Sequence, residues 1–201
     1  MPENAFSFQP FEGKRVRVEC TRSFEEVLLN LRSLVGTTLP KKGNTQQARG
    51  DTHEQFEAFG EEYLAAMQIG GGVSQENFEK VIQSRVGESD FMLFLELDHG
   101  KWLPIFGIQR KVVRWILGNP LLAITMMRHD ITAGLFAPVE LLLMENELGD
   151  GSTVIYDLPS SLMVIEPNPA LLAAAHILDQ KLQALVDRAT GVELEGLPEP
   201  A

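Results

Sequence analysis

Residues 138–158 read PVELLLMENELGDGSTVIYDL, the most informative stretch of the chain for its architecture. Two apolar runs, Pro138 to Asn146 and Thr153 to Leu158, have the composition of β-strands. Between them, Glu147 to Ser152 carries the dipeptide Asp-Gly, which is typical of hairpin turns. The spacing predicts a hairpin whose two strands pair in the antiparallel direction.

Three further strands are predicted elsewhere in the chain, at Lys14 to Cys20, Phe91 to Asp98 and Arg110 to Leu117. The first alternates apolar and polar residues, as a half-buried strand requires. In the second, alternation predicts one face made of Leu93, Leu95 and Leu97.

Helix starts are marked by Ser23, Ser74, Asn119 and Asn168. Ser23 has Glu26 three residues on, which is a capping box, and both asparagines precede a proline, which favours the first helical position. Glycines or the end of the apolar pattern predict helix ends near Gly36, Gly87, His129 and Gly191. Helices interspersed with an antiparallel hairpin indicate the α+β class, with helices on one face of an antiparallel sheet.

The length of 201 residues predicts one domain. We place that domain at residues 14–190, after an N-terminal extension at 1–13 and before a loose tail at 191–201. Residues 37–73 are polar, rich in glycine and acidic, and are interpreted as an inserted helical segment on the surface.

The composition restricts partners and location. Lys and Arg number 17 against 28 Asp and Glu, so the net charge of -11 disfavours nucleic-acid binding. The single cysteine, Cys20, cannot form a disulfide within the chain, and no signal peptide or apolar run long enough to span a bilayer is found. We therefore expect a cytoplasmic protein with no membrane partner.

Several motifs together carry a resemblance to a known family. They are Phe91 to Gly100, Leu117 to Leu121, His129 to Glu140 and Tyr156 to Leu162. In these stretches the chain resembles the domain of unknown function family 302. The likeness is good over residues 74–190 and looser over 14–36.

The resemblance implies a fold similar to the TATA-binding-protein class, in which a curved antiparallel sheet carries two long helices on one face, often as a homodimer. It implies no reaction. Many bacterial relatives have a cysteine where this chain has Gly118, so thiol or metal chemistry suggested for them does not transfer here.

A charge asymmetry marks the candidate site. From His99 to His129 there is no Asp or Glu, while five basic residues give +5, so the rest of the chain carries -11 - 5 = -16. The helix that starts at Asn119 lies in this window, and the N-terminus of a helix can bind an anion through free N–H groups and the helix dipole. The alternative is that the basic residues pair with carboxylates from the rest of the chain, which we name the acidic shell. The five basic residues are Lys101, Arg110, Lys111, Arg114 and Arg128.

The leading hypothesis is a small-molecule-binding or accessory protein whose ligand is apolar or aromatic and carries an anionic group. No motif implies a cofactor, because the phosphate-binding and dinucleotide-binding glycine patterns are absent from the sequence. The predicted ligand-binding residues are His99, Lys101, Trp102, Arg114, Gly118 and Asn119.

Two alternatives remain open. In the first, the protein is an isomerase, lyase or hydrolase, metal-dependent or acid-base, in which His99 and His129 converge with Asp98 and Asp130. Against it, the two aspartates have the ordinary roles of capping and turn formation available to them. In the second alternative, the protein is a dimeric interaction module that uses an exposed sheet edge or face.

Overall fold

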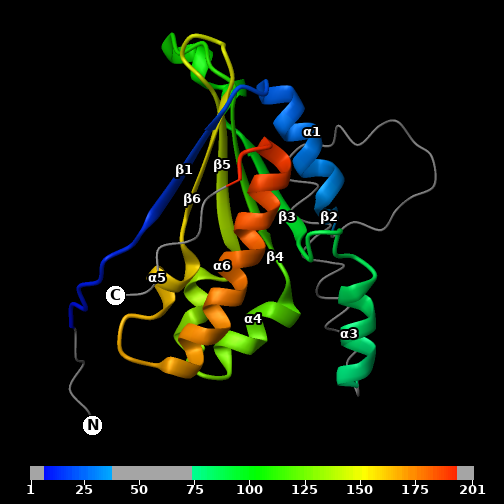
Figure 1. Ribbon diagram of the computed structural model, residues 1–201, viewed down its shortest axis with the longest axis vertical. Helices are drawn as coiled ribbons and strands as arrows, with labels where there is room; N and C mark the ends of the chain where they lie inside the picture. The colour runs from blue at the N-terminus through cyan, green and yellow to red at the C-terminus, as the bar shows by residue number, and fades with distance from the viewer. Residues whose placement is uncertain (1–6, 38–73, 194–201) are drawn as a thin grey trace.

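The computed structural model describes residues 7–37 and 74–193. Within them the chain forms one six-stranded sheet in the order β1-β6-β5-β4-β3-β2 (Figure 1). The strands are β1 (Arg15–Cys20), β2 (Gly36–Thr37), β3 (Met92–Asp98), β4 (Val112–Gly118), β5 (Val139–Glu145) and β6 (Ser152–Asp157). All neighbouring strands pair antiparallel except β2 and β3. The predicted hairpin is present as β5 and β6, with Leu142 opposite Ile155.

The α-helices are α1 (Phe24–Leu34), α3 (Gln75–Gln83), α4 (Pro120–Met127), α5 (Pro159–Met163) and α6 (Pro169–Thr190). Short 3-10 helices form η1 (His99–Lys101), η2 (Leu103–Phe106) and η3 (Ile131–Phe136). Ser23 closes a complete capping box with Glu26, and Asn168 accepts from the Leu171 N–H at the start of α6. The predicted N-caps are therefore confirmed.

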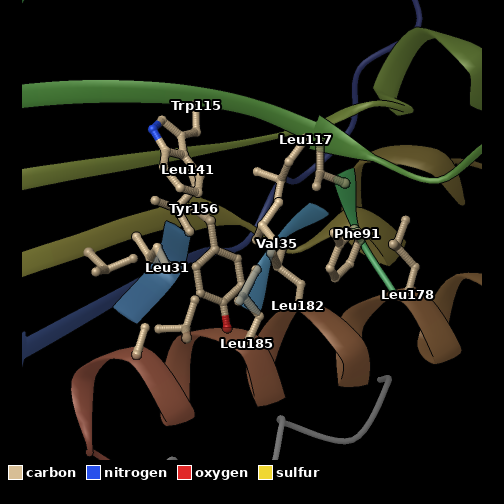
Figure 2. Packing of buried hydrophobic residues seen from close by; sticks show 14 of the residues in the cluster. Leu31, Val35, Phe91, Trp115, Leu117, Leu141, Tyr156, Leu178, Leu182 and Leu185 are labelled. Carbon is tan, nitrogen blue, oxygen red and sulfur yellow. The ribbon is translucent and has the colours of Figure 1, made fainter. Parts of the chain in front are cut away.

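The core lies between one face of the sheet and the helices α1 and α6. Alternate residues of the central strands point into it, while Leu182 and Leu185 of α6 approach from the other side (Figure 2). The largest side chain in the core, Trp115, is 1% exposed. The free energy gained by burying such side chains holds the apolar face of α6 against the sheet. The α+β class, with two helices on one face of a mostly antiparallel sheet, is confirmed; the finer likeness to the TATA-binding-protein class stays a prediction.

A bulge in β3 corrects one prediction. Leu93 lies opposite the fully buried Leu117, whereas Leu95 lies opposite Ile116, so the register shifts between them. Residues that lie opposite each other on neighbouring strands point to the same face of the sheet. One extra residue in β3 therefore places the residues after it on the other face from the one that strict alternation predicts. Leu93 therefore faces the core, while Leu95 and Leu97 face the side opposite α1 and α6, and the three leucines do not form one face. We name that side the uncovered face, because none of the long helices among the described residues packs on it.

Other differences are local. The helix α4 ends at Met127, two residues before the expected end, and η3 and α5 were not predicted. No described helix is long and apolar enough to cross a membrane. The expected insertion at 37–73 lies outside the described residues except for Thr37, as do residues 1–6 of the extension and 194–201 of the tail.

Candidate functional site

A cleft of about 760 Å³ lies where β4 runs into α4. Figure 1 shows α4 below the strands, at the lower end of the sheet. Its volume falls within the range of small-molecule sites. The helices α3 and α4, the first half of β3 and the segment from η3 to β5 contribute its walls. The apolar lining includes Phe78, Phe94, Leu121, Leu122, Met126, Met127 and Val139.

The bulge in β3 and the glycine at the end of β4 shape the inner wall. A Cβ atom at Gly118 would lie 3.0 Å from Phe94 Cε2 and 3.2 Å from Pro138 Cβ. Because glycine has no such atom, the Phe94 ring lies against the strand end and forms part of the cleft. Gly118 and Asn119, two of the predicted ligand-binding residues, both line this cleft.

The start of α4 has no N–H group to offer to an anion. Asn119 Oδ1 accepts from the Leu121 N–H at 2.8 Å, and the N–H groups of Leu122 and Ala123 donate to Asn119 O at 3.0 and 2.9 Å. Pro120 carries no N–H. The prediction of free donors at this helix start is therefore wrong, because the asparagine that starts the helix also satisfies its first turn.

The cation beside the cleft is Arg128, just beyond the opposite end of α4. Its Nε donates to Ile124 O at 3.2 Å, which directs the guanidinium along the helix. Within the described residues no carboxylate forms an ion pair with it. Glu79 of α3 is the acidic residue of the lining and accepts from Gln75 at 2.7 Å. The sequence showed Arg128 only as part of the basic window.

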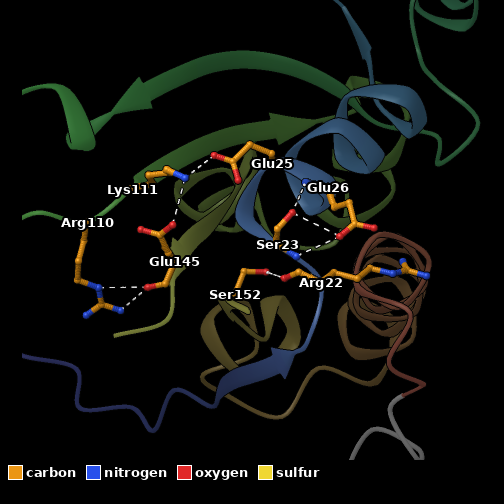
Figure 3. A network of polar contacts seen from close by, with 8 residues as sticks. All are labelled: Arg22, Ser23, Glu25, Glu26, Arg110, Lys111, Glu145 and Ser152. Atoms are coloured by element: carbon orange, nitrogen blue, oxygen red, sulfur yellow. Dashed lines mark hydrogen bonds and ion pairs between the residues drawn. The ribbon is translucent and has the colours of Figure 1, made fainter. Parts of the chain in front are cut away.

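Two other basic residues of the window, Arg110 and Lys111, are engaged by acidic residues, as the alternative interpretation predicts. Lys111 pairs with Glu25 and Glu145, and Arg110 donates two hydrogen bonds to the Glu145 carbonyl oxygen (Figure 3). The carboxylate of Glu25 holds the pKa of Lys111 above its ordinary value. These cations are engaged by the acidic shell and lie away from the cleft.

Arg114, also predicted to bind ligand, pairs with Glu140 on the uncovered face of the sheet. It lines a second hollow of about 600 Å³, together with the ion pair between Arg15 and Asp157. Arg114 is therefore separate from the cleft at Gly118.

The remaining predicted residues, His99, Lys101 and Trp102, lie at the far end of β4. The seven residues of β4 span about 20 Å at about 3.3 Å per residue. Trp102 Nε1 donates to His99 Nδ1 at 3.3 Å, so these two side chains contact each other and not Asn119. The six residues predicted as one site are thus divided between the two ends of the sheet and, for Arg114, its uncovered face.

The two histidines of the enzyme alternative do not converge. His99 follows β3 at one end of the sheet, and His129 follows α4 at the other. Asp130 caps η3, accepting from the Thr132 hydroxyl and N–H at 2.7 and 2.9 Å, and these hydrogen bonds lower its pKa. Asp98 precedes η1. Among residues 7–37 and 74–193, no cluster of three His, Cys, Asp or Glu side chains could hold a metal ion.

The sheet, the two covering helices and the terminal cleft define an open-sheet α+β domain. The model of the family described as domain of unknown function DUF302 matches residues 72–189, more than half of the chain. The chain belongs to that family, as the sequence motifs predicted.

Among solved structures, the chain is similar to an uncharacterised conserved DUF302 protein from Bacillus stearothermophilus. The TM-score is 0.52 at 16% sequence identity, and the match covers 87% of this chain and 97% of that one. At this identity the likeness shows the fold alone. None of the curated proteins compared with the chain matches it.

Proposed function

We propose that this protein binds a small, mainly apolar molecule with one anionic group in the cleft between α3 and α4. The observation that carries the proposal is a mainly apolar cleft in which, among residues 7–37 and 74–193, Arg128 is the lining cation and Glu79 the lining carboxylate. The biochemical activity of the family is not established, and no reaction is proposed.

The lining favours an apolar ligand body. Phe78 and Phe94 approach from two different elements, Met127 adds flexible, polarisable surface, and Met126 is buried in the wall. Half-buried apolar side chains at a concave surface gain free energy when a ligand displaces water from them.

Arg128 favours an anionic end group. Its Nε is engaged by Ile124 O, which leaves the outer nitrogens of the fork available to a carboxylate. Because the start of α4 is already satisfied by Asn119, the cation and not the helix N-terminus would hold the acid group.

The test compares octanoate with 1-octanol by calorimetric titration. We expect both to bind, and octanoate to bind roughly tenfold more tightly because of one charge-assisted pair. Arg128→Gln should remove that preference and Arg128→Lys should keep part of it. Ala123→Phe, which fills the cleft, should abolish binding of both, whereas Ala184→Phe on the exposed side of α6 should not. Equal affinities of the native protein and Ala123→Phe would overturn the proposal.

We also propose that the protein is a homodimer through the uncovered face of the sheet. That face carries half-buried aliphatic residues together with both charge signs, as in the pair of Arg114 and Glu140, and a two-fold interface needs such self-complementarity. Sedimentation velocity should give a dimer, and Leu142→Arg, at the centre of that face, should give a monomer.

The cytoplasmic location is proposed as well. The single cysteine, Cys20, is buried and free, which suits a reducing compartment. Fractionation of cells that express the chain should recover it with cytoplasmic markers; recovery with an extracytoplasmic fraction would contradict this.

A further inference from the structure

Exposed apolar side chains gather at the end of the molecule opposite the cleft. Four of them lie within seven consecutive residues, and the fifth lies on the turn between β5 and β6. The exposed fractions are 46% for Trp102, 78% for Ile105, 72% for Phe106, 46% for Ile108 and 88% for Leu148. We name these five residues the apolar tip.

The two segments of the tip lie side by side. Arg110 joins them, since it donates to the Glu145 carbonyl oxygen at 2.6 Å and approaches the Glu147 carboxylate at 3.5 Å. Figure 1 shows the short helices after β3 and the β5–β6 turn together at the upper extremity of the long axis. Neither cleft is lined by any tip residue, so the tip is a projecting surface.

The aromatic part of the tip is held in place. His99 and Trp102 meet edge to face with ring centroids 5.8 Å apart, and Trp102 and Phe106 do so at 6.1 Å. Gly107, with φ of 79°, ends η2 in the left-handed conformation and turns the chain immediately after Phe106. Little side-chain entropy is then left to lose when the tip is buried.

We propose that the apolar tip inserts into the interfacial layer of a phospholipid bilayer. Trp, Phe and Ile on a projecting surface can bury apolar area in a fluid layer, which requires no matching shape. An indole ring is well suited to the headgroup level. Lys101, on the same segment, is an exposed cation that can meet a lipid phosphate.

Shape and charge favour a lipid layer. The five side chains, with roughly 600 Å² of apolar surface, stand on a projection and line neither hollow, so the tip offers no groove for a partner segment to fill. The net charge of -11 repels anionic surfaces, so a bilayer with zwitterionic headgroups is the expected partner. The sequence predicted no membrane partner because only spanning segments are visible there, whereas this tip depends on exposure in the folded chain.

The experiment is flotation of the full chain with phosphatidylcholine vesicles, with and without phosphatidylserine. Binding should occur, and phosphatidylserine should weaken it at low salt. Ile105→Ser with Phe106→Ser should reduce the partition coefficient at least about tenfold. The matched control is Leu29→Ser with Ile177→Ser, which removes two exposed apolar side chains from α1 and α6 and should leave binding unchanged.

A second readout places the tip in the bilayer. Brominated lipids should quench the fluorescence of the exposed Trp102 and spare that of the buried Trp115. In Trp102→Phe, which keeps Trp115, the quenching should be lost. Unchanged thermal unfolding confirms that the Ser variants are folded. Absence of flotation, or equal flotation of tip and control variants, would overturn the proposal. So would a self-association that the tip variant alone abolishes, since the tip would then bind protein.

Discussion

The side-chain amide nitrogen of Asn119 donates to the backbone oxygen of Asp90 at 2.9 Å. The same side chain accepts from the Leu121 N–H, and the Asp90 carboxylate pairs with Lys181 of α6. One asparagine therefore joins the start of α4 to Asp90, two residues before β3, and through Asp90 to α6. These are elements around the proposed ligand cleft.

Asn119→Ala should lower the free energy of unfolding by about 1–3 kcal/mol, because both the helix cap and the bond to Asp90 are lost. Asn119→Ser, which restores the cap alone, should recover about 1 kcal/mol of that loss. Urea unfolding measures both. An alanine variant as stable as the native protein would contradict the assigned role.

Glu96 is expected to matter for Trp115 more than for its surface ion pair. Trp115 is 1% exposed and its Nε1 donates to Glu96 Oε2 at 2.9 Å, while Arg32 pairs with the same carboxylate. Glu96→Leu leaves the indole N–H without an acceptor and should cost about 1–3 kcal/mol of unfolding free energy. Glu96→Gln retains an acceptor, and Arg32→Ala removes an exposed pair; each should cost less than about 1 kcal/mol. Equal losses in all three variants would contradict this ranking.

Asp179 should make stability depend on pH. It is 1% exposed, its Oδ1 accepts from the Ser160 N–H at 3.0 Å, and burial raises its pKa against the opposing hydrogen bond from Ser160. The folded chain then keeps a proton at pH values where the unfolded chain, with a pKa of about 3.9, has lost it. The contribution of Asp179 is therefore most favourable below about pH 4 and decreases as pH rises.

Asp179→Asn keeps the acceptor for Ser160 and removes the titration. The difference in unfolding free energy between variant and native protein should move in favour of the variant as pH rises from about 4 to about 7. Urea unfolding at several pH values measures it. A difference that does not change with pH would contradict the direction of the pKa shift.

Gly36 should tolerate no side chain. A Cβ atom there would lie 1.8 Å from the carbonyl oxygen of Arg85 and 2.6 Å from the nitrogen of Gly87. Gly36→Ala should therefore cost more than about 3 kcal/mol of stability, because backbone must move. Gly107→Ala, in open space but with a positive φ, should cost only about 1 kcal/mol. Thermal unfolding compares the two, and similar losses would show that the close approach is not limiting.

Local sequence signals predicted the elements, and long-range contacts decided the rest. The capping box at Ser23 and the helix end at Gly191 each depend on contacts within one turn of helix, so the local sequence is enough to predict them. The bulge between Leu93 and Leu95 depends on pairing with β4, which alternation along one strand cannot show. The strand β2 is two residues long and has no pattern of its own.

The candidate site was predicted in part for the same reason. Gly118 and Asn119 do line the cleft, although the free N–H groups for which they were predicted are already satisfied by Asn119. His99 and Trp102 are near them only in sequence, since β4 runs the length of the sheet in between. Arg128 shared the basic window with four other cations, and only the fold shows which of them reaches the cleft.

The most direct test of ligand binding in the cleft is NMR spectroscopy of methionine methyl groups during an octanoate titration. Met126 and Met127 line the cleft, whereas Met144 and Met163 do not. Saturable shifts confined to the methyl groups of Met126 and Met127, and absent in Ala123→Phe, are the predicted result. Shifts at Met144 or Met163 alone, or none at any methyl group, would contradict ligand binding in this cleft.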